Sequence, residues 1–109
     1  MTDAMLAMQP RIARYLARCD WSAVPAMAGR TFTVTPLAGG EYNYNFLLTA
    51  GEDMRVFRVN LGTQIARDDQ IRYEFKALQL LAPSGVTPRP YFVDDTRQIL
   101  DHGIAIMEY

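Results

Sequence analysis

The chain has 109 residues, of which 50% are hydrophobic and 21% are charged, and its net charge is -1. That length and composition are typical of one globular domain with one modest core. The charge argues against a nucleic-acid partner, which would favour a basic excess. The single cysteine, Cys19, excludes an internal disulfide. No apolar run approaches the ~20 residues that cross a bilayer, and the N-terminus has no signal-peptide pattern. We therefore expect a cytoplasmic protein without a membrane partner.

The first expected element is a helix over residues 3–19. Apolar residues recur there at spacings of three and four, which predicts one apolar stripe. These residues are Met5, Met8, Ile12, Tyr15, Leu16 and Cys19. Pro10 lies inside the pattern and should kink or split the helix, because it removes a backbone donor. The helix is expected to pack on the domain, with a membrane-surface helix as the alternative, and residues 21–30 are expected to form a connector.

Five stretches rich in β-branched and aromatic residues follow, and short turns predict that they join as antiparallel hairpins. The expected strands cover residues 31–37, 42–49, 54–61, 91–93 and 104–108. A helix over 68–82 separates the third strand from the fourth, with Asp68 or Asp69 as its cap and Pro83-Ser84-Gly85 as its end. The sequence thus predicts an α+β fold, in which a five-stranded antiparallel sheet carries a central helix and an extra N-terminal helix.

Glu74 is the first candidate functional residue, because of its position on the helix over 68–82. At about 100° per residue, one apolar stripe runs along this helix and Glu74 lies inside it. The stripe consists of Ile71, Phe75, Leu78, Leu81 and Ala82. A buried carboxylate is costly without a partner. Glu74 is therefore expected either to pair with a cation or to reach solvent from the edge of the stripe.

Arg58 is the candidate cation. In the strand over 54–61, Met54, Val56, Arg58 and Asn60 share one face, because strand side chains alternate. A guanidinium on that face either pairs with Glu74 and binds phosphate oxygens bidentately, or is an ordinary solvated arginine. A cation on a strand followed by a carboxylate on a helix is the order of parts that kinase-type phosphoryl transfer uses.

The third candidate is the stretch 37–45, which contains the pair Gly39-Gly40. Such a turn can offer backbone N–H groups to a phosphate, or can simply close a hairpin. Asn43 and Asn45 alternate with aromatic residues and so face one side, where they either bond a ligand or mark the wet surface. His102 is the only histidine. It has no second histidine or cysteine at metal-ligand spacing, so we expect a turn residue rather than a ligand.

Taken together, these stretches resemble the N-terminal lobe of the aminoglycoside phosphotransferase and choline kinase family, which is related to the protein kinases. The matching segments are Gly39-Gly40-Glu41-Tyr42-Asn43, Val56-Phe57-Arg58-Val59, Tyr73-Glu74-Phe75-Lys76-Ala77-Leu78, Thr87-Pro88 and Ile106-Met107-Glu108-Tyr109. The resemblance covers residues 31–109. It implies two parts: a helix with a connector over 1–30, and a kinase-like nucleotide-binding lobe over 31–109, without the catalytic lobe.

The resemblance implies a phosphate-binding side of a nucleotide site. Arg58 would contact the α- and β-phosphates, and Glu74 would hold Arg58. The loop over the phosphates would consist of Gly39, Gly40, Tyr42 and Asn43. The sequence departs from the family at Tyr42, where many members have a serine or threonine, and at Arg58, where protein kinases have a lysine.

The resemblance also implies an adenine-binding side. Leu37 and Val56 would form an apolar roof over the base. Met107 would lie at the back of the pocket, and the Glu108 carbonyl would accept the first hydrogen bond from adenine.

The cofactors implied by the resemblance are ATP and Mg²⁺. Family members carry the catalytic aspartate, its neighbouring histidine and the Mg²⁺ ligands in a second lobe, so no catalytic residue and no metal ligand is assigned in this chain. The first hypothesis is the ATP-binding lobe of a small-molecule kinase that is inactive as this fragment. Its acceptor would be a hydroxyl of an aminoglycoside, choline-like or sugar-like molecule, bound through the second lobe.

Two alternatives stay open at this point: a non-catalytic kinase-like interaction module, and an α+β domain without a nucleotide site. A lobe on its own would expose the apolar surface that meets its partner lobe. We therefore also expect either a homodimer, with or without exchanged elements, or poor solubility.

Overall fold

The computed structural model describes residues 3–40, 42–61, 70–85, 87–97 and 100–109, and the side chains of its second helix from Phe75 onward. In chain order the elements are α1 (Asp3–Arg18), β1 (Thr33–Gly39), β2 (Asn43–Ala50), β3 (Asp53–Asn60), α2 (Gln70–Leu81), the short 3₁₀-helix η1 (Ala82–Ser84), β4 (Pro90–Asp94) and β5 (Gly103–Glu108). Each strand begins and ends within two residues of its predicted bounds. No helix in these ranges is long and apolar enough to cross a membrane.

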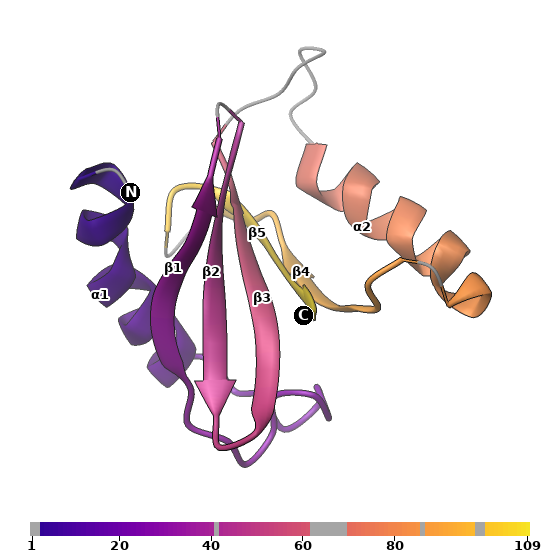
Figure 1. The fold of residues 1–109 in the computed structure, drawn as a ribbon, viewed down its shortest axis with the longest axis horizontal. Coiled ribbons are helices and arrows are strands. Elements are labelled where there is room, and N and C mark those ends of the chain that lie inside the picture. The colour runs from indigo at the N-terminus through magenta and orange to yellow at the C-terminus, as the bar shows by residue number, and fades with distance from the viewer. Residues whose placement is uncertain (1–2, 41, 62–69, 86, 98–99) are drawn as a thin grey trace.

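The strands form one antiparallel sheet in the order β1-β2-β3-β5-β4 (Figure 1). β5 lies between β3 and β4, so the last hairpin folds back and inserts its second strand beside β3. Side chains alternate along each strand, and the two faces of the sheet therefore carry different residues. The predicted α+β fold with a five-stranded antiparallel sheet and two helices is confirmed.

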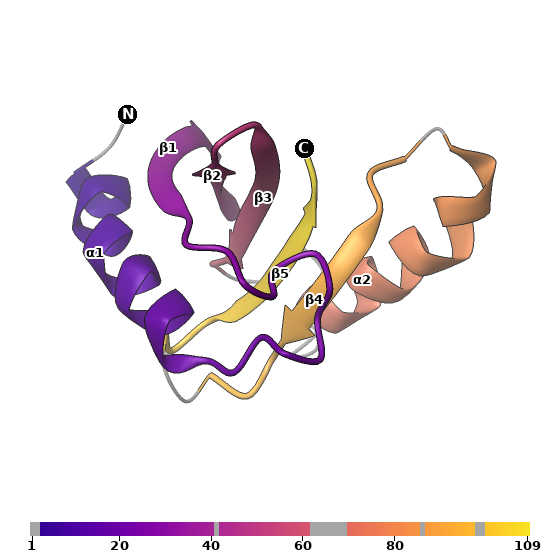
Figure 2. The ribbon, with the colours of Figure 1, turned by 90° about the horizontal axis from the view of Figure 1, so that it is seen from below.

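One face of the sheet packs against α1 and the connector 19–32, and we call it the α1 face (Figure 2). Its buried core consists of Met5, Met8, Ile12, Tyr15, Met27, Val34, Phe46, Leu48, Phe57, Val59, Leu100, Ile104 and Ile106. The ring of Tyr15 meets Phe57 edge-on at 5.8 Å between centroids. In the same way Trp21 of the connector meets Phe92 of β4 at 4.9 Å. Burial of this apolar surface is the main driving force for the fold.

α1 is one continuous helix through Pro10, so Pro10 does not split it, and the alternative of a kink stays a prediction. Met5 and Met8 before the proline and Ile12 and Tyr15 after it are all buried in the same core. Pro10 itself lies on the exposed side. Packing on both sides of the proline therefore offsets the backbone hydrogen bond that the proline removes.

The opposite face of the sheet, which we call the α2 face, meets α2 over β4 and β5. Phe75 and Leu78 pack there against Val93, Ala105 and Met107, as their place in the predicted stripe requires. Leu81 is 49% exposed, so its predicted burial is wrong. It is the last residue of α2, and this end of the helix extends away from the sheet (Figure 1).

The end of the second helix is as predicted, but its beginning is not described. Gly85 follows η1 with φ at 73°, in the left-handed region where glycine is favoured. The predicted caps Asp68 and Asp69 lie outside the described residues.

Candidate functional site

Arg58 lies on the α2 face of β3, as the alternation predicts. Its neighbours Phe57 and Val59 are fully buried on the α1 face. Across the sheet, Arg58 is paired with Asn45 on β2 and with Ala105 on β5. Its Nε donates a hydrogen bond to Asn45 Oδ1 at 3.0 Å. The Arg58 side chain is half-buried, and its Nε is held by Asn45 of the neighbouring strand.

A second polar pair lies next to the first on the same face. Asn60 is only 8% exposed, and its Nδ2 donates to Asn43 Oδ1 at 3.3 Å. Asn43 and Asn45 therefore bond side chains of the neighbouring strand. Alternation predicts the common face of Asn43 and Asn45, but it predicts neither of these two bonds and no place for Asn60 in the site. The signal for both was the strand register, which pairs Asn43 with Asn60 and Asn45 with Arg58.

An apolar row lies beside the polar pairs. Val56 is paired with Leu47 on β2 and with Met107 on β5. Val56 packs against the small cluster that Met107, at 3% exposed, forms with Phe75 and Ala105. Val56 and Arg58 are two residues apart on one strand, about 6.6 Å at strand rise. The α2 face thus offers an apolar surface directly next to a cation.

The turn at Gly39-Gly40, which we call the glycine turn, joins β1 to β2 at the end of the sheet near the polar pairs. The Gly40 N–H donates to the Asn43 carbonyl at 3.0 Å, and the Tyr42 carbonyl accepts from the Leu61 N–H at 2.8 Å. A Cβ added to Gly39 would lie 2.7 Å from Met5 Sδ. Gly39 therefore packs closely against Met5 of α1, and a side chain at this position would require Met5 to shift. Contact of this turn with phosphates stays a prediction.

Leu37 lies at the bulge in the β1–β2 pairing, between Pro36 and Ala38. Its side chain is 43% exposed, and the residue borders a cavity of about 240 Å³ that Met5 and Pro36 also line. The bulge separates Leu37 from the regular pairing, which would set it opposite Asn45. Its predicted place over adenine stays a prediction.

The segment 107–109 ends the described chain beside the start of β4. The Glu108 N–H donates to the Arg89 carbonyl at 2.7 Å, and Glu108 Oε1 accepts from the Arg89 N–H at 3.2 Å. These two bonds fix the backbone of Glu108. Its carbonyl as an acceptor for adenine stays a prediction.

Glu74 belongs to α2, but its side chain lies outside the described residues. The ion pair between Arg58 and Glu74 therefore stays a prediction. The described part of α2 places Phe75 and Leu78 against the sheet.

The α1 face has its own polar centre, formed by Tyr15 and Asp94. The Tyr15 hydroxyl donates to Asp94 Oδ2 at 2.8 Å. Burial, and then the bond to Asp94, raise the pKa of Tyr15, so this residue stays protonated. Burial opposes the charge of Asp94, but hydrogen bonds from Thr96 and Tyr15 outweigh it and lower the pKa of Asp94. This bond links α1 to β4, and Tyr15, its donor, is buried in the core.

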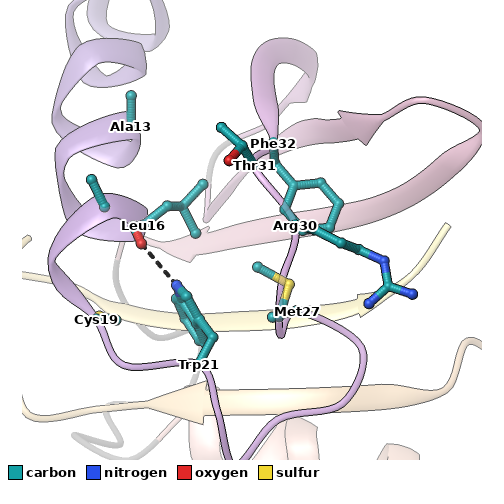
Figure 3. Close-up of a pocket in the computed structure, with 9 residues that line it drawn as sticks. Ala13, Leu16, Cys19, Trp21, Met27, Arg30, Thr31 and Phe32 are labelled. Atoms are coloured by element: carbon teal, nitrogen blue, oxygen red, sulfur yellow. Dashed lines mark hydrogen bonds between the residues drawn. The ribbon is translucent and has the colours of Figure 1, made fainter.

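A cavity of about 330 Å³ lies between α1 and the connector (Figure 3). Leu16, Trp21, Met27 and Phe32 line it, and the Trp21 Nε1–H donates to the Leu16 carbonyl at 2.8 Å. Cys19 borders the same cavity, and burial raises the pKa of its thiol. A thiol of raised pKa is a poor nucleophile, which agrees with the expectation that Cys19 serves packing.

In the described part of the chain, no three or more His, Cys, Asp and Glu side chains cluster so that they could hold a metal ion. His102 lies in the bend before β5, as the sequence predicts. The described residues of the α2 face supply a cation, amides and apolar surface, which suit binding of an anion with an attached ring.

The comparisons with known proteins agree with this geometry. A model of the phosphotransferase enzyme family matches residues 33–109. Among solved structures, the fold is similar to that of a proposed aminoglycoside phosphotransferase from Ralstonia eutropha JMP134, with a TM-score of 0.62 and 17% identity. That match covers 92% of this chain and 27% of the other, so the chain spans about a quarter of that protein's length. A search of curated proteins finds no match.

The family match begins at β1 and includes the whole sheet, α2 and the candidate residues from Leu37 to Glu108, whereas α1 precedes it. The chain therefore belongs, through residues 33–109, to the phosphotransferase enzyme family.

Proposed function

We propose that the α2 face binds ATP and that this chain is the nucleotide-binding part of a small-molecule kinase. The observation that supports this most directly is the placement of Arg58 beside Val56 on one face of β3, with the Arg58 guanidinium held by Asn45 at 3.0 Å. An arginine fixed in this way can bind phosphate oxygens bidentately.

The two sides of the nucleotide would use different residues. The adenine ring would lie against the apolar row of Leu47, Val56 and Met107, whose members are neighbours across β2, β3 and β5. The phosphates would lie toward Arg58 and the glycine turn. Glu74 would pair with Arg58 from α2, and Mg²⁺ would be bound with the phosphates by residues of a second lobe.

The acceptor would be a hydroxyl of an aminoglycoside, a choline-like alcohol or a sugar-like molecule. We expect no phosphoryl transfer from the 109 residues alone. The described residues of the α2 face include no carboxylate or histidine that would take the proton of an acceptor hydroxyl. Sustained turnover in a coupled kinase and ATPase assay of this chain would overturn that expectation.

The test of nucleotide binding is calorimetric titration of ATP–Mg²⁺ into the wild type, Arg58→Ala and Arg55→Ala. Arg55 is a matched control, because it has the same charge on the same strand but faces the other side. There it donates to the Ala26 carbonyl and lies 5.3 Å from the Tyr91 ring centroid.

We expect Arg58→Ala to weaken ATP affinity by about tenfold or more, since it removes charged hydrogen bonds. Arg55→Ala should leave the affinity within about twofold, because surface changes away from the site have small effects. Equal affinities in the two variants, or a folded wild type that binds no ATP, would count against the proposed function.

A further inference from the structure

α1 touches the glycine turn from the side of the sheet opposite to Arg58. Met5 is 2% exposed, and its sulfur lies where a side chain at Gly39 would begin, 2.7 Å from an added Cβ. Gly39 is the last residue of β1, and the next N–H, that of Gly40, closes the turn onto Asn43. Met5 therefore packs directly against the base of the turn.

A second contact fixes β1 one turn further along the helix. The Gln9 side chain donates from Nε2 to the Val34 carbonyl at 2.6 Å. β1 is an edge strand, with β2 as its one neighbour in the sheet. Its outer carbonyls lack a ladder partner, so a side-chain donor there restrains the strand.

The far end of α1 is fixed to the other edge of the sheet. Tyr15 bonds Asp94 of β4 at 2.8 Å, and Arg11 forms an ion pair with Asp101 at 3.2 Å. α1 therefore connects β4, at one edge, to β1 and its turn, at the other. A helix held at both ends in this way can limit the movement of the turn relative to the sheet.

We infer that Met5 and Gln9 are positioning residues for the β1–β2 turn, and that through the turn they set the affinity for the nucleotide phosphates. The effect on phosphate affinity rests on the proposed function. The restraint of the turn does not, because it follows from the contacts of α1. α1 precedes the family match, so this restraint comes from residues outside the matched lobe.

The experiment measures two quantities on the full chain: amide hydrogen exchange at Gly40 by NMR, and ATP–Mg²⁺ affinity by calorimetry. The variants are Met5→Ala and its matched control Met8→Ala. Met8 is the same residue type in the same helix and is also buried, at 8% exposed, but it is not among the nearest atoms to Gly39.

We expect Met5→Ala to raise the exchange rate at Gly40 by about tenfold relative to Met8→Ala, because it removes the local restraint. The affinity for ATP–Mg²⁺ should fall by about fivefold, as is typical of coupling between distant sites. Gln9→Leu, which keeps the size but removes the donor, should change both quantities in the same direction and serves if Met5→Ala folds poorly.

A double variant distinguishes restraint of the turn by Met5 from a general loss of core packing. Gly39→Ala alone pushes against Met5 and should raise exchange at Gly40. In Gly39→Ala combined with Met5→Ala, the new methyl group occupies the space that the sulfur leaves, and exchange should return toward the wild-type rate. Effects that add, without this coupling, would overturn the inference.

The remaining outcomes distinguish the inference from the proposed function. If the wild type binds ATP–Mg²⁺ but Met5→Ala and Met8→Ala agree in both readouts, the inference is wrong and the proposed function stands. If the exchange pattern is as expected but the wild type binds no ATP–Mg²⁺, the restraint of the turn is supported and the proposed function fails.

Discussion

Arg58 and Asn45 face each other across β3 and β2, and the Nε of the arginine donates to the amide oxygen of the asparagine at 3.0 Å. This bond uses the Nε of Arg58, so it restrains the orientation of the guanidinium relative to the sheet. Asn45 is thus a positioning residue for the candidate phosphate-binding cation. A substitution of Asn45 on β2 should therefore alter the position of the Arg58 guanidinium on β3.

Asn45→Ala should weaken ATP–Mg²⁺ affinity by about fivefold, because the lost hydrogen bond contributes about 1 kcal/mol to holding Arg58. Thr49→Ala on the same face of β2, four residues along, is the control and should bind as the wild type does. Calorimetric titration measures both. An Asn45→Ala variant with unchanged affinity would show that Arg58 does not depend on this bond.

Phe57→Ala should lower the free energy of unfolding by about 3–5 kcal/mol, because it leaves a cavity where a fully buried ring meets Tyr15. Met54→Ala on the same strand should change it by less than about 0.5 kcal/mol, since Met54 is 42% exposed. Urea denaturation followed by fluorescence gives both values. Similar losses in the two variants would contradict the assignment of the α1 face as the core.

Asp94→Asn should destabilise the fold by about 1–2 kcal/mol at neutral pH, because the amide keeps one accepting oxygen. Its NH₂ group cannot accept the bond from Tyr15 or Thr96 that the second carboxylate oxygen accepts. The pKa of Asp94 is lower in the folded state than its ordinary value of about 3.9. The stabilising contribution of the charge is therefore full above the ordinary value and is lost as the pH falls through the lower, folded value.

Urea denaturation of the wild type and of Asp94→Asn from pH 7 to pH 2.5 tests this dependence. The difference in unfolding free energy should be constant near neutral pH and should shrink below about pH 4. The control is Glu52→Gln, which changes an exposed carboxylate of the β2–β3 turn. A difference that grows as the solution is acidified would refute the sign of the Asp94 contribution.

At pH 7.5, Cys19 should react with a thiol reagent about tenfold more slowly than a free cysteine peptide does. The physical reason is that burial raises the pKa of its thiol, which lowers the fraction of thiolate. In urea the same cysteine should react at the rate of the peptide. Absorbance of the released reagent measures both rates, and fast reaction in the folded state would show that the cavity wall is open at Cys19.

Strand positions could be predicted well from the sequence, because alternation and turn residues are local signals. The bounds of β1 to β5 agree within two residues, and the face shared by Val56 and Arg58 follows from alternation alone. Continuity of α1 through Pro10 could not be predicted, since it depends on core contacts on both sides of the proline.

The residue that faces a given side chain on the neighbouring strand was less predictable than the face of the sheet on which that side chain lies. The bond between Asn45 and Arg58 depends on the register of β2 and β3, which their turn sets. Gly39 illustrates the same limit, because its contact with Met5 joins residues 34 positions apart. The exposure of Leu81 followed from the length of α2 relative to β4 and β5, which periodicity does not give.

The outer strands of the sheet each contain a proline, Pro36 in β1 and Pro90 in β4. A proline has no N–H to donate, and Gln9 already uses the carbonyl of Val34 on β1. A strand from a second copy laid along β1 would therefore lose bonds at both positions, which opposes fibre-like growth of the sheet. The homodimer that the sequence predicts would instead have to join through side chains such as Leu80, which is 75% exposed on α2.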